Sequence, residues 1–491
     1  MTDSPNDDGP THVVTAFLRN AGEILLARRS DAVGTSTGTW GAVSGFAEGD
    51  PDAQVRREIA EETGIEDVCT LVRSGRPLEV TDADTGRGWV VHPYLFDCDD
   101  RDVDLSEEHD ALEWVHPTAI PTGEYDTVPG LWAAYERVAP TVRSITADAD
   151  HGAAWLSIRG LEVLRDRAGL LVAEREGEGE GQPFEGTEPG GGANGKTGDA
   201  EVEWDELATL ADRLLEARPS MAVLRNRIDR AMGTALEAAG GMDGSEVERE
   251  SVYEGDDGDA ANDDGIEGDA ASEDETPVPD AAAVLEATTT VLERAVTVDD
   301  EAARRASGRL EGTVMTLSRS GTVLEAIRAS DARRIYVAES RPGREGVGVA
   351  ESLADERPVT LHTDASAASL LSRESIDRVV VGADTIRPDG AVVNKAGTRG
   401  MTLAAVHERI PVTVVAASDK ISTREDIPLE SGSRNAVYGG DAAIDVANPT
   451  FDVTPAECVT DVVTERGVLE SDDVSALVEE ARELAAWREK R

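Results

Sequence analysis

Lysine and long apolar runs are scarce in this 491-residue chain. Lysine occurs only at positions 196, 395, 420 and 490, so nearly all of the 47 basic residues are arginine. No apolar run approaches the roughly 20 residues that a membrane-crossing helix needs, so we expect no membrane span. The first ten residues are acidic and lack an apolar core, which predicts no secretory signal peptide.

Cysteine is equally rare. Cys69, Cys98 and Cys458 lie far apart, are odd in number and lack the spacing of a metal site. They do not suggest a disulfide framework, and a reducing compartment fits them. We therefore expect a cytoplasmic protein.

Acidic residues dominate the composition, since 99 Asp and Glu against 47 Lys and Arg give a formal net charge of -52. Such a surface repels nucleic acid at low salt, because phosphate binding relies on basic contacts. An acidic disordered protein is one interpretation, but periodic apolar stretches occur along most of the chain. A folded protein of a high-salt cytoplasm, where ions screen the self-repulsion, fits better. The composition resembles that of haloarchaeal proteins.

Patterning divides the chain into four parts. After a disordered tail at 1–10, residues 11–142 mix short apolar strands with turns and one charged helix at 52–63. Residues 150–310 have helical periodicity. Residues 311–491 alternate apolar strand runs with helices, and strands buried on both faces predict a doubly wound parallel sheet. The fold class is therefore α/β.

Two stretches inside the helical part depart from its pattern. Residues 174–203 and 240–280 are rich in glycine and acid and have almost no apolar side chains to bury. We predict that both are flexible acidic insertions.

Three glutamates carry the chemistry of the first part. Glu58, Glu61 and Glu62 stand at i, i+3 and i+4, so their carboxylates share one helix face. Like charges this close destabilise a helix unless a cation lies among them. Hard oxygen ligands suit Mg²⁺ or Mn²⁺, which would bridge diphosphate oxygens and polarise an attacking water. The alternative is a solvated acidic face in a very acidic protein.

The order of residues favours the metal site. Residues 57–65, R-E-I-A-E-E-T-G-I, follow a strand and a glycine loop and resemble the core of the Nudix box position for position. The resemblance implies a Nudix α/β/α sandwich and a hydrolase of nucleoside diphosphate-linked compounds that needs Mg²⁺ or Mn²⁺. Gly64 would end the helix in a left-handed turn.

The same resemblance assigns roles to individual residues. It makes Glu61 and Glu62 metal ligands and Glu58 a further ligand or the catalytic base, while Arg57 orients a catalytic glutamate by a charge-assisted bond. The Gly45 carbonyl could complete the metal site. Another ligand could come from a downstream acid, but the spacing cannot choose among Glu107, Glu108 and Glu113.

One position departs from the family's box. Where the family has a glutamate eight residues before the arginine, this chain has Gly49. Glu48 and Asp50 flank it in a loop that is shorter than usual. Either one of these acids substitutes for the missing glutamate, or the loop holds metal less well.

A second constellation lies at 377–398, DRVVVGADTIRPDGAVVNKAGT. Its apolar strand ends at Asp384, on the carboxyl edge of a parallel sheet, where ligands of such folds bind. Asn394 and Lys395 precede a helix that begins near Thr398, and its backbone N–H groups could hold a phosphate. Alternatively, Asp384 caps a turn and Lys395 is a surface charge.

This pattern resembles the family that unites the α, β and δ subunits of translation initiation factor 2B with two isomerases. Those isomerases act on methylthioribose-1-phosphate and ribose-1,5-bisphosphate. Further matches lie at 217–226, 339–346 and 448–457. The resemblance implies a helical subdomain, a Rossmann-like sheet and a homodimer formed through the C-terminal half. A translation-factor partner follows from this kinship alone.

The resemblance also places a ligand, either a sugar phosphate or a nucleotide. The residues expected near it are Arg341, Gly343, Asp384, Asn394 and Lys395. Arg159 and Gly160 resemble a phosphate-binding Arg-Gly pair of the isomerases, and a surface charge on a helix is the alternative.

Isomerase activity is doubtful because one residue is exchanged. The isomerases pair the aspartate with a cysteine on a strand-end motif, which here reads Met-Thr-Leu-Ser at 315–318. The Ser318 hydroxyl is a much poorer acid than a thiol. Three hypotheses remain: a Nudix hydrolase with a ligand-sensing second domain, a translation-factor-like binding protein with a weak Nudix domain, and a sugar-phosphate isomerase.

Overall fold

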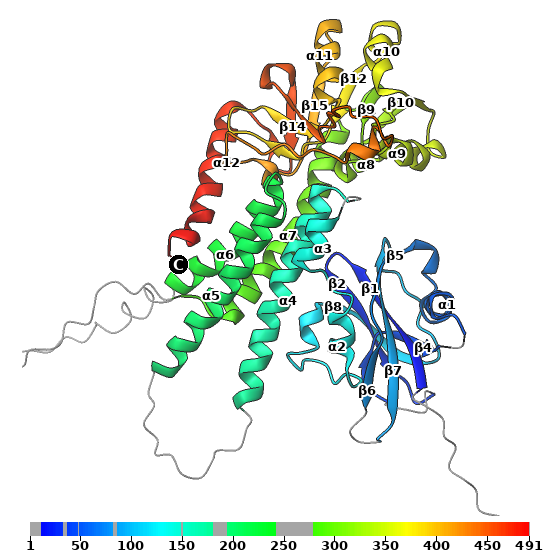
Figure 1. Cartoon of the computed structure of the whole chain (residues 1–491), viewed down its shortest axis with the longest axis vertical. Coiled ribbons are helices and arrows are strands. Elements are labelled where there is room, and N and C mark those ends of the chain that lie inside the picture. Colours follow the sequence, from blue (N-terminus) through cyan, green and yellow to red (C-terminus); the bar gives the residue numbers. More distant parts are fainter. Residues whose placement is uncertain are drawn as a thin grey trace, which may run out of the picture.

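Figure 1 shows three modules in a computed structural model of the chain. The structure describes residues 11–32, 37–47, 49–81, 86–148, 151–179, 194–241 and 278–490. The predicted tail at 1–10, residues 180–193 of the first acidic insertion and residues 242–277 of the second lie outside these residues. A bundle of long helices forms the middle of the molecule, the N-terminal module lies along its side, and the C-terminal sheet lies at one end.

The N-terminal module is a mixed sheet between helices. Its strands are β1 (Thr11–Asn20), β2 (Glu23–Arg29), β3 (Trp40–Gly41), β4 (Val43–Phe46), β5 (Cys69–Ser74), β6 (Leu78–Thr81), β7 (Gly88–Cys98) and β8 (His109–Val115). The long strands β1 and β7 pair in parallel at its centre. Helix α1 (Pro51–Thr63) packs on one face and α2 (Leu131–Glu136) on the other. The predicted α/β/α sandwich is confirmed.

Helix α1 has clear start and stop signals. The side chain of Asp50 accepts a hydrogen bond from the backbone of Asp52, and Pro51 occupies the first turn, where its missing N–H costs nothing. Gly64 ends the helix with φ 72°, as predicted, because glycine enters the left-handed region without strain. These signals fix where α1 begins and ends, and therefore which side of the helix carries its glutamates.

Two cysteines contradict the sequence-based expectation. Cys69 and Cys98 form a disulfide between β5 and β7, with 4.2 Å between their Cα atoms. They are direct partners in the antiparallel register, which brings side chains 29 residues apart together. Sequence spacing does not show such cross-strand pairing, so the expectation of no disulfide framework missed this bond, and the cysteines no longer support a reducing compartment.

The middle module consists of helices. They are α3 (Val142–Ala147), α4 (Ala153–Gly179), α5 (Asn194–Ala217), α6 (Ala222–Gly241) and α7 (Ala281–Ser307). Their shared core also receives Trp487 from the C-terminal end of the chain. Helices α4 and α5 extend into both ends of the predicted insertion 174–203. That insertion is therefore shorter than expected, and residues 180–193 remain outside the described part.

The C-terminal module is built on a doubly wound sheet. Its strands are β9 (Glu311–Leu317), β10 (Asp331–Ala338), β11 (Val359–His362), β12 (Arg378–Val381), β15 (Val412–Val415), β17 (Asp461–Thr464) and β18 (Gly467–Val468). The spatial order is β11-β10-β9-β12-β15-β17-β18, and only the last pairing is antiparallel. The predicted Rossmann-like parallel sheet is confirmed.

Helices cover both faces of this sheet. They are α8 (Gly321–Arg328), α9 (Glu345–Ala354), α10 (Ala367–Arg373), α11 (Thr398–Glu408) and α12 (Ser471–Leu484). Alternate strand residues enter two separate apolar clusters, which explains why the strand runs are continuously apolar. A small sheet of β13 (Thr385–Ile386), β14 (Val392–Lys395) and β16 (Phe451–Thr454) adjoins its carboxyl edge. No described helix has the length and apolarity to cross a membrane.

Buried charges join the N-terminal module to the helices. Arg19 of β1 is 1% exposed and lies 2.7 Å from Asp97 and 3.0 Å from Glu162 of α4. A second guanidinium, that of Arg159, lies 3.0 Å from Glu162. Burial and the neighbouring Arg19 lower the pKa of Arg159 to about 10. Glu162 therefore balances two buried cations at once.

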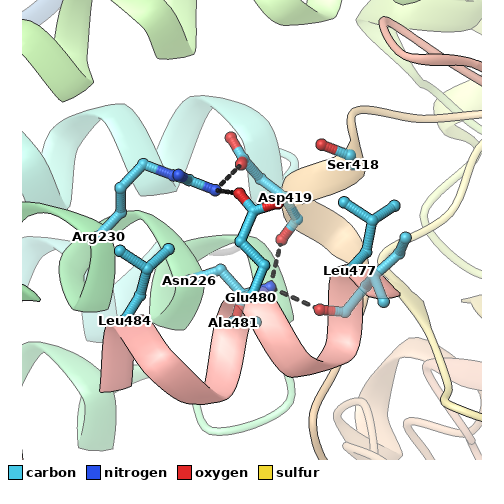
Figure 2. A pocket seen from close by; sticks show the side chains of 9 residues that line it. Asn226, Arg230, Ser418, Asp419, Leu477, Glu480, Ala481 and Leu484 are labelled. Atoms are coloured by element: carbon cyan, nitrogen blue, oxygen red, sulfur yellow. Dashed lines mark hydrogen bonds and ion pairs between the residues drawn. The ribbon is translucent and has the colours of Figure 1, made fainter. Parts of the chain in front are cut away.

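A similar cluster joins the helices to the parallel sheet. Asp419, just past the carboxyl end of β15, is 2% exposed and pairs with Arg227 of α6 at 3.0 Å and Arg294 of α7 at 2.7 Å. Figure 2 shows Arg230 pointing to both Asp419 and Glu480 of α12, while the Asn226 amide donates to two backbone carbonyls. The cavity between these side chains is only about 10 Å³, too small for a ligand. This cluster is a junction between modules.

Replacing Glu162 with leucine tests the first junction. Glu162→Leu leaves Arg19 and Arg159 buried with only Asp97 to balance them, so we expect a loss of about 3–5 kcal/mol in unfolding free energy. The measurement is urea unfolding at high salt. Glu479→Leu is the control, because Glu479 pairs with Arg482 on an exposed helix face and should change stability by less than about 1 kcal/mol. Equal effects of the two substitutions would contradict a stabilising role for the buried network.

Candidate functional site

A cavity of about 600 Å³ opens in the N-terminal module beside α1. Three carboxylates line it: Glu58 and Glu61 from α1, and Glu108 from the segment before β8. Arg29 at the end of β2 lines it as well. Most of the remaining wall is apolar. The cavity thus combines a strongly charged wall with a surface suited to an uncharged group.

Glu58 lies directly against the backbone of β4. A Cβ atom added to Gly45 would stand 2.0 Å from both Cδ and Oε1 of Glu58, so only glycine admits the carboxylate here. The Gln54 amide, one turn earlier on α1, donates to Glu58 at 2.5 Å. Burial and the neighbouring Glu61 raise the pKa of Glu58, although Gln54 opposes the rise. Gly45 and Glu58 are therefore adjacent, as the motif implied.

Glu62 is the buried member of the set. It is 5% exposed, and its Oε2 atom has no hydrogen-bond partner among the described residues. The ring of His109 places Nε2 3.8 Å from that oxygen, and the positive charge of Arg29 also acts on the carboxylate. Burial, reinforced by the charges of Glu58 and Glu108, raises the pKa of Glu62 to about 8. A buried acid of this kind holds its proton until a cation compensates its charge.

These features fit a divalent cation. The donors are hard oxygens, the Gly45 backbone is accessible only because it carries no Cβ, and one buried carboxylate oxygen lacks a partner. Across the described residues, no three acidic, histidine or cysteine side chains are already clustered at metal-binding positions. Carboxylate side chains can close around an ion by rotamer changes, which the backbone of α1 permits. The residues that would hold it are Glu58, Glu61, Glu62 and Glu108, with the carbonyl of Gly45.

The structure selects one of the three downstream acids. Glu108 lines the cavity, whereas Glu113 accepts a hydrogen bond from Tyr125 and Glu107 is exposed beyond the cavity lining. Sequence spacing could not decide this, because neighbouring positions in an irregular segment point in different directions. Glu108 is therefore the downstream ligand candidate.

Other expectations for this site turn out differently. Arg57 is exposed, and its positive charge opposes the rise in the pKa of Glu58, but within the described ranges no hydrogen bond or ion pair joins it to a carboxylate. Asp50, one candidate to replace the absent glutamate at Gly49, caps α1 instead. Glu48 lies outside the described residues. Arg29 was missed because a single arginine at a strand end carries no sequence signal.

The raised pKa of Glu62 predicts how stability depends on pH without metal. Between its unfolded pKa of 4.5 and its folded pKa of about 8, the folded state keeps a proton that the unfolded state has lost. The free energy of unfolding therefore falls as pH rises through this window, by an amount on the order of a few kcal/mol. The Glu62→Gln side chain cannot titrate, so the unfolding free energy of this variant should decrease less as pH rises. Urea unfolding of both proteins at pH 5.5 and 8, with a chelator present, measures this difference. The same pH dependence in the two proteins would contradict a raised pKa of Glu62.

The second site lies where the order of the parallel strands reverses. Strands β9 and β12 are neighbours there, and their carboxyl ends carry Ser318 and Asp384. Ligands of doubly wound sheets bind at such a switch point. Ser318 has φ 61°, and its backbone N–H donates to the Ser340 hydroxyl at 2.6 Å. The two positions named from the motif thus follow the carboxyl ends of adjacent strands.

Two lysines compensate Asp384. Burial raises the pKa of Asp384, and the positive charges of Lys420 and Lys395 oppose the rise. Lys395 also lies 2.8 Å from Glu345, which closely approaches Gly343. Lys420 is 5% exposed, and among the described residues no hydrogen bond or close ion pair is found for its ammonium group. Lysine is so scarce in the sequence that Lys395 attracted attention, and the same argument would have identified Lys420.

Two further predicted residues take other partners. The Asn394 amide donates to the Thr398 hydroxyl at 3.0 Å, which holds the start of α11. Arg341 is largely exposed and pairs with Glu339 at 3.2 Å. The fold therefore groups Asp384, Lys395 and Gly343 but leaves Arg341 at the surface.

Arg159 and Gly160 serve neither of the purposes considered for them. Arg159 is 5% exposed and is held by Glu162 and Asp97 at the junction with the N-terminal module. Gly160 packs against Leu224, which its Cβ would approach to 2.4 Å. Neither a phosphate site nor an exposed charge is present at this position, because the N-terminal module covers it.

Comparisons with known proteins agree with this architecture. Residues 150–471 match the Initiation factor 2 subunit family, and residues 9–137 match the NUDIX domain. Because the first match covers more than half of the 491 residues, the chain belongs to the Initiation factor 2 subunit family. A NUDIX domain precedes the family region.

Curated relatives are similar over a limited stretch. Methylthioribose-1-phosphate isomerase of Pseudomonas aeruginosa is 41% identical over 172 residues, which cover 32% of this chain and 48% of the relative. The isomerase of Azotobacter vinelandii is 39% identical over 174 residues, covering 32% and 49%. The chain thus spans about half the length of the curated relatives it matches.

Solved structures resemble the chain at low identity. Translation initiation factor eIF-2B of Pyrococcus horikoshii is 22% identical with a TM-score of 0.48, covering 67% of this chain and 94% of its own. The 5-methylthioribose 1-phosphate isomerase of the same organism is 18% identical with a TM-score of 0.46, covering 76% and 89%.

Proposed function

We propose that the N-terminal domain is a Mg²⁺- or Mn²⁺-dependent hydrolase of nucleoside diphosphate-linked compounds. The supporting observation is that Glu58, Glu61 and Glu108 line one cavity, beside the buried Glu62, one of whose carboxylate oxygens has no hydrogen-bond partner among the described residues. Carboxylates with this crowding bind a divalent cation, which supplies charge neutralisation for the diphosphate and lowers the pKa of water.

The chain's own residues have separable roles in this proposal. Glu58, held by Gly45 and Gln54, is the candidate base, because its raised pKa brings it closer to neutral pH. Glu61, Glu62 and Glu108 balance the cation. Arg29, on the same cavity wall, offers the positive charge that orients a phosphate group.

A hydrolysis assay tests the proposal. Purified protein in high salt with Mg²⁺ is incubated with ADP-ribose and with ribo- and deoxyribonucleoside triphosphates, and release of monophosphate is measured. Glu58→Gln and Glu108→Gln should each reduce kcat by about 100-fold or more, since an acid–base group or a charge-balancing ligand is lost. Glu107→Gln is the matched control, because this adjacent exposed glutamate does not line the cavity, and it should retain activity. Absence of hydrolysis with every compound, or equal loss in the control, would refute the hydrolase.

For the C-terminal domain, we propose binding of a sugar phosphate or nucleotide without isomerisation. The supporting observation is the buried Lys420 beside Asp384, which leaves a positive charge available at the switch point. Ser318 cannot readily supply the proton transfer that a thiol would. The role is then regulatory, in a homodimer that binds a translation-factor partner.

Calorimetry with ribose-1,5-bisphosphate and AMP tests this second proposal. Lys420→Met should weaken binding at least 10-fold, because a charge-assisted contact to phosphate is lost. Lys490→Met, which removes a lysine from the C-terminal end of the chain, should leave affinity unchanged. Turnover of ribose-1,5-bisphosphate that depends on Asp384 would replace the binding role with catalysis.

A further inference from the structure

The cavity beside α1 has an aromatic wall whose position is informative. Phe46 is 59% exposed, and in the described part of the chain it is the only aromatic among the large exposed hydrophobic side chains. Trp89 of β7 stands next to it, with ring centroids 6.4 Å apart and ring planes tilted by 34°. Both rings line the same cavity as the carboxylates. An exposed phenyl ring beside a half-buried indole is unfavourable in water, so the place of the two rings in a cavity indicates a bound apolar surface.

The aromatic wall is joined directly to the charged wall. Phe46 follows Gly45, whose backbone lies against the Glu58 carboxylate. Arg87 lies over the Trp89 ring at 5.3 Å, a cation–π contact that favours this orientation of the indole. A ligand that reaches both walls must therefore carry a planar apolar group close to its diphosphate.

We propose that Phe46 and Trp89 bind the nucleobase of a nucleoside diphosphate by contact with its face. This inference rests on the proposed hydrolase and specifies its substrate class. The apolar lining of the cavity also includes Val80, Val91 and Val128. Its uncharged polar side chains are already engaged or buried: Ser44 donates to the Ala42 carbonyl, Gln54 donates to Glu58, and Thr15 is buried. Every base offers a π-face, whereas discrimination between bases needs hydrogen bonds to their edges. The site therefore accepts different bases with similar affinity.

Binding of two non-hydrolysable analogues separates the base from the diphosphate. Adenosine α,β-methylene diphosphate carries both, and methylenediphosphonate carries only the diphosphate. Isothermal calorimetry in high salt with Mg²⁺ compares the full-length chain with Phe46→Ala and Trp89→Ala. We expect each substitution to lower the affinity for the adenosine analogue by about 5-fold or more, because base–aromatic stacking is lost. Affinity for methylenediphosphonate should not change.

Leu71→Ala is the matched control, since Leu71 is an exposed apolar residue of the same domain that does not line the cavity. The uridine analogue should bind within about 10-fold of the adenosine analogue, as expected for recognition without edge contacts. The inference is overturned if neither aromatic substitution weakens binding of the adenosine analogue, or if binding of methylenediphosphonate weakens to the same extent. It is also overturned if the affinities for the adenosine and uridine analogues differ by 100-fold. Aromatic-dependent binding without any hydrolysis would instead overturn the hydrolase and leave the base site in place.

Discussion

Buried arginine–carboxylate contacts hold the three modules in one arrangement. In a chain with a net charge of -52, most acids can remain solvated, but those that pack between modules need a cation. Arg19 and Arg159 meet Glu162 at one junction, while Arg227 and Arg294 meet Asp419 at the other. Because a guanidinium is planar, always charged and less strongly hydrated than an ammonium, arginine suits these buried positions better than lysine. The near absence of lysine is consistent with that use.

Helix α7 connects the two junctions. Leu292 packs against Gly22 of the N-terminal module, and Arg294, two residues later, pairs with Asp419 beside the parallel sheet. Asp419 immediately precedes Lys420, which faces Asp384. One turn of one helix thus contacts both domains that carry candidate sites.

The N-terminal cavity concentrates features that are costly elsewhere in a protein. Glu62 is buried with one carboxylate oxygen that has no hydrogen-bond partner among the described residues, Glu58 presses on the backbone of Gly45, and Phe46 is exposed. Local arrangements of this kind lower stability, and they persist because the surrounding sheet fixes them. A bound divalent cation and a nucleotide would relieve all three, which connects the local cost with the proposed function.

The sequence by itself determined the order of modules, the type of both sheets and the helix of three glutamates, because periodicity and cap residues act locally. It also placed Asp384 at a strand end. Only the tertiary structure decided that Cys69 meets Cys98, that Glu108 rather than Glu107 or Glu113 reaches the cavity, and that Arg159 is buried at a junction. Each of these contacts joins segments that are far apart in the chain. Packing sets their relative positions, which cannot be predicted from local residue spacing.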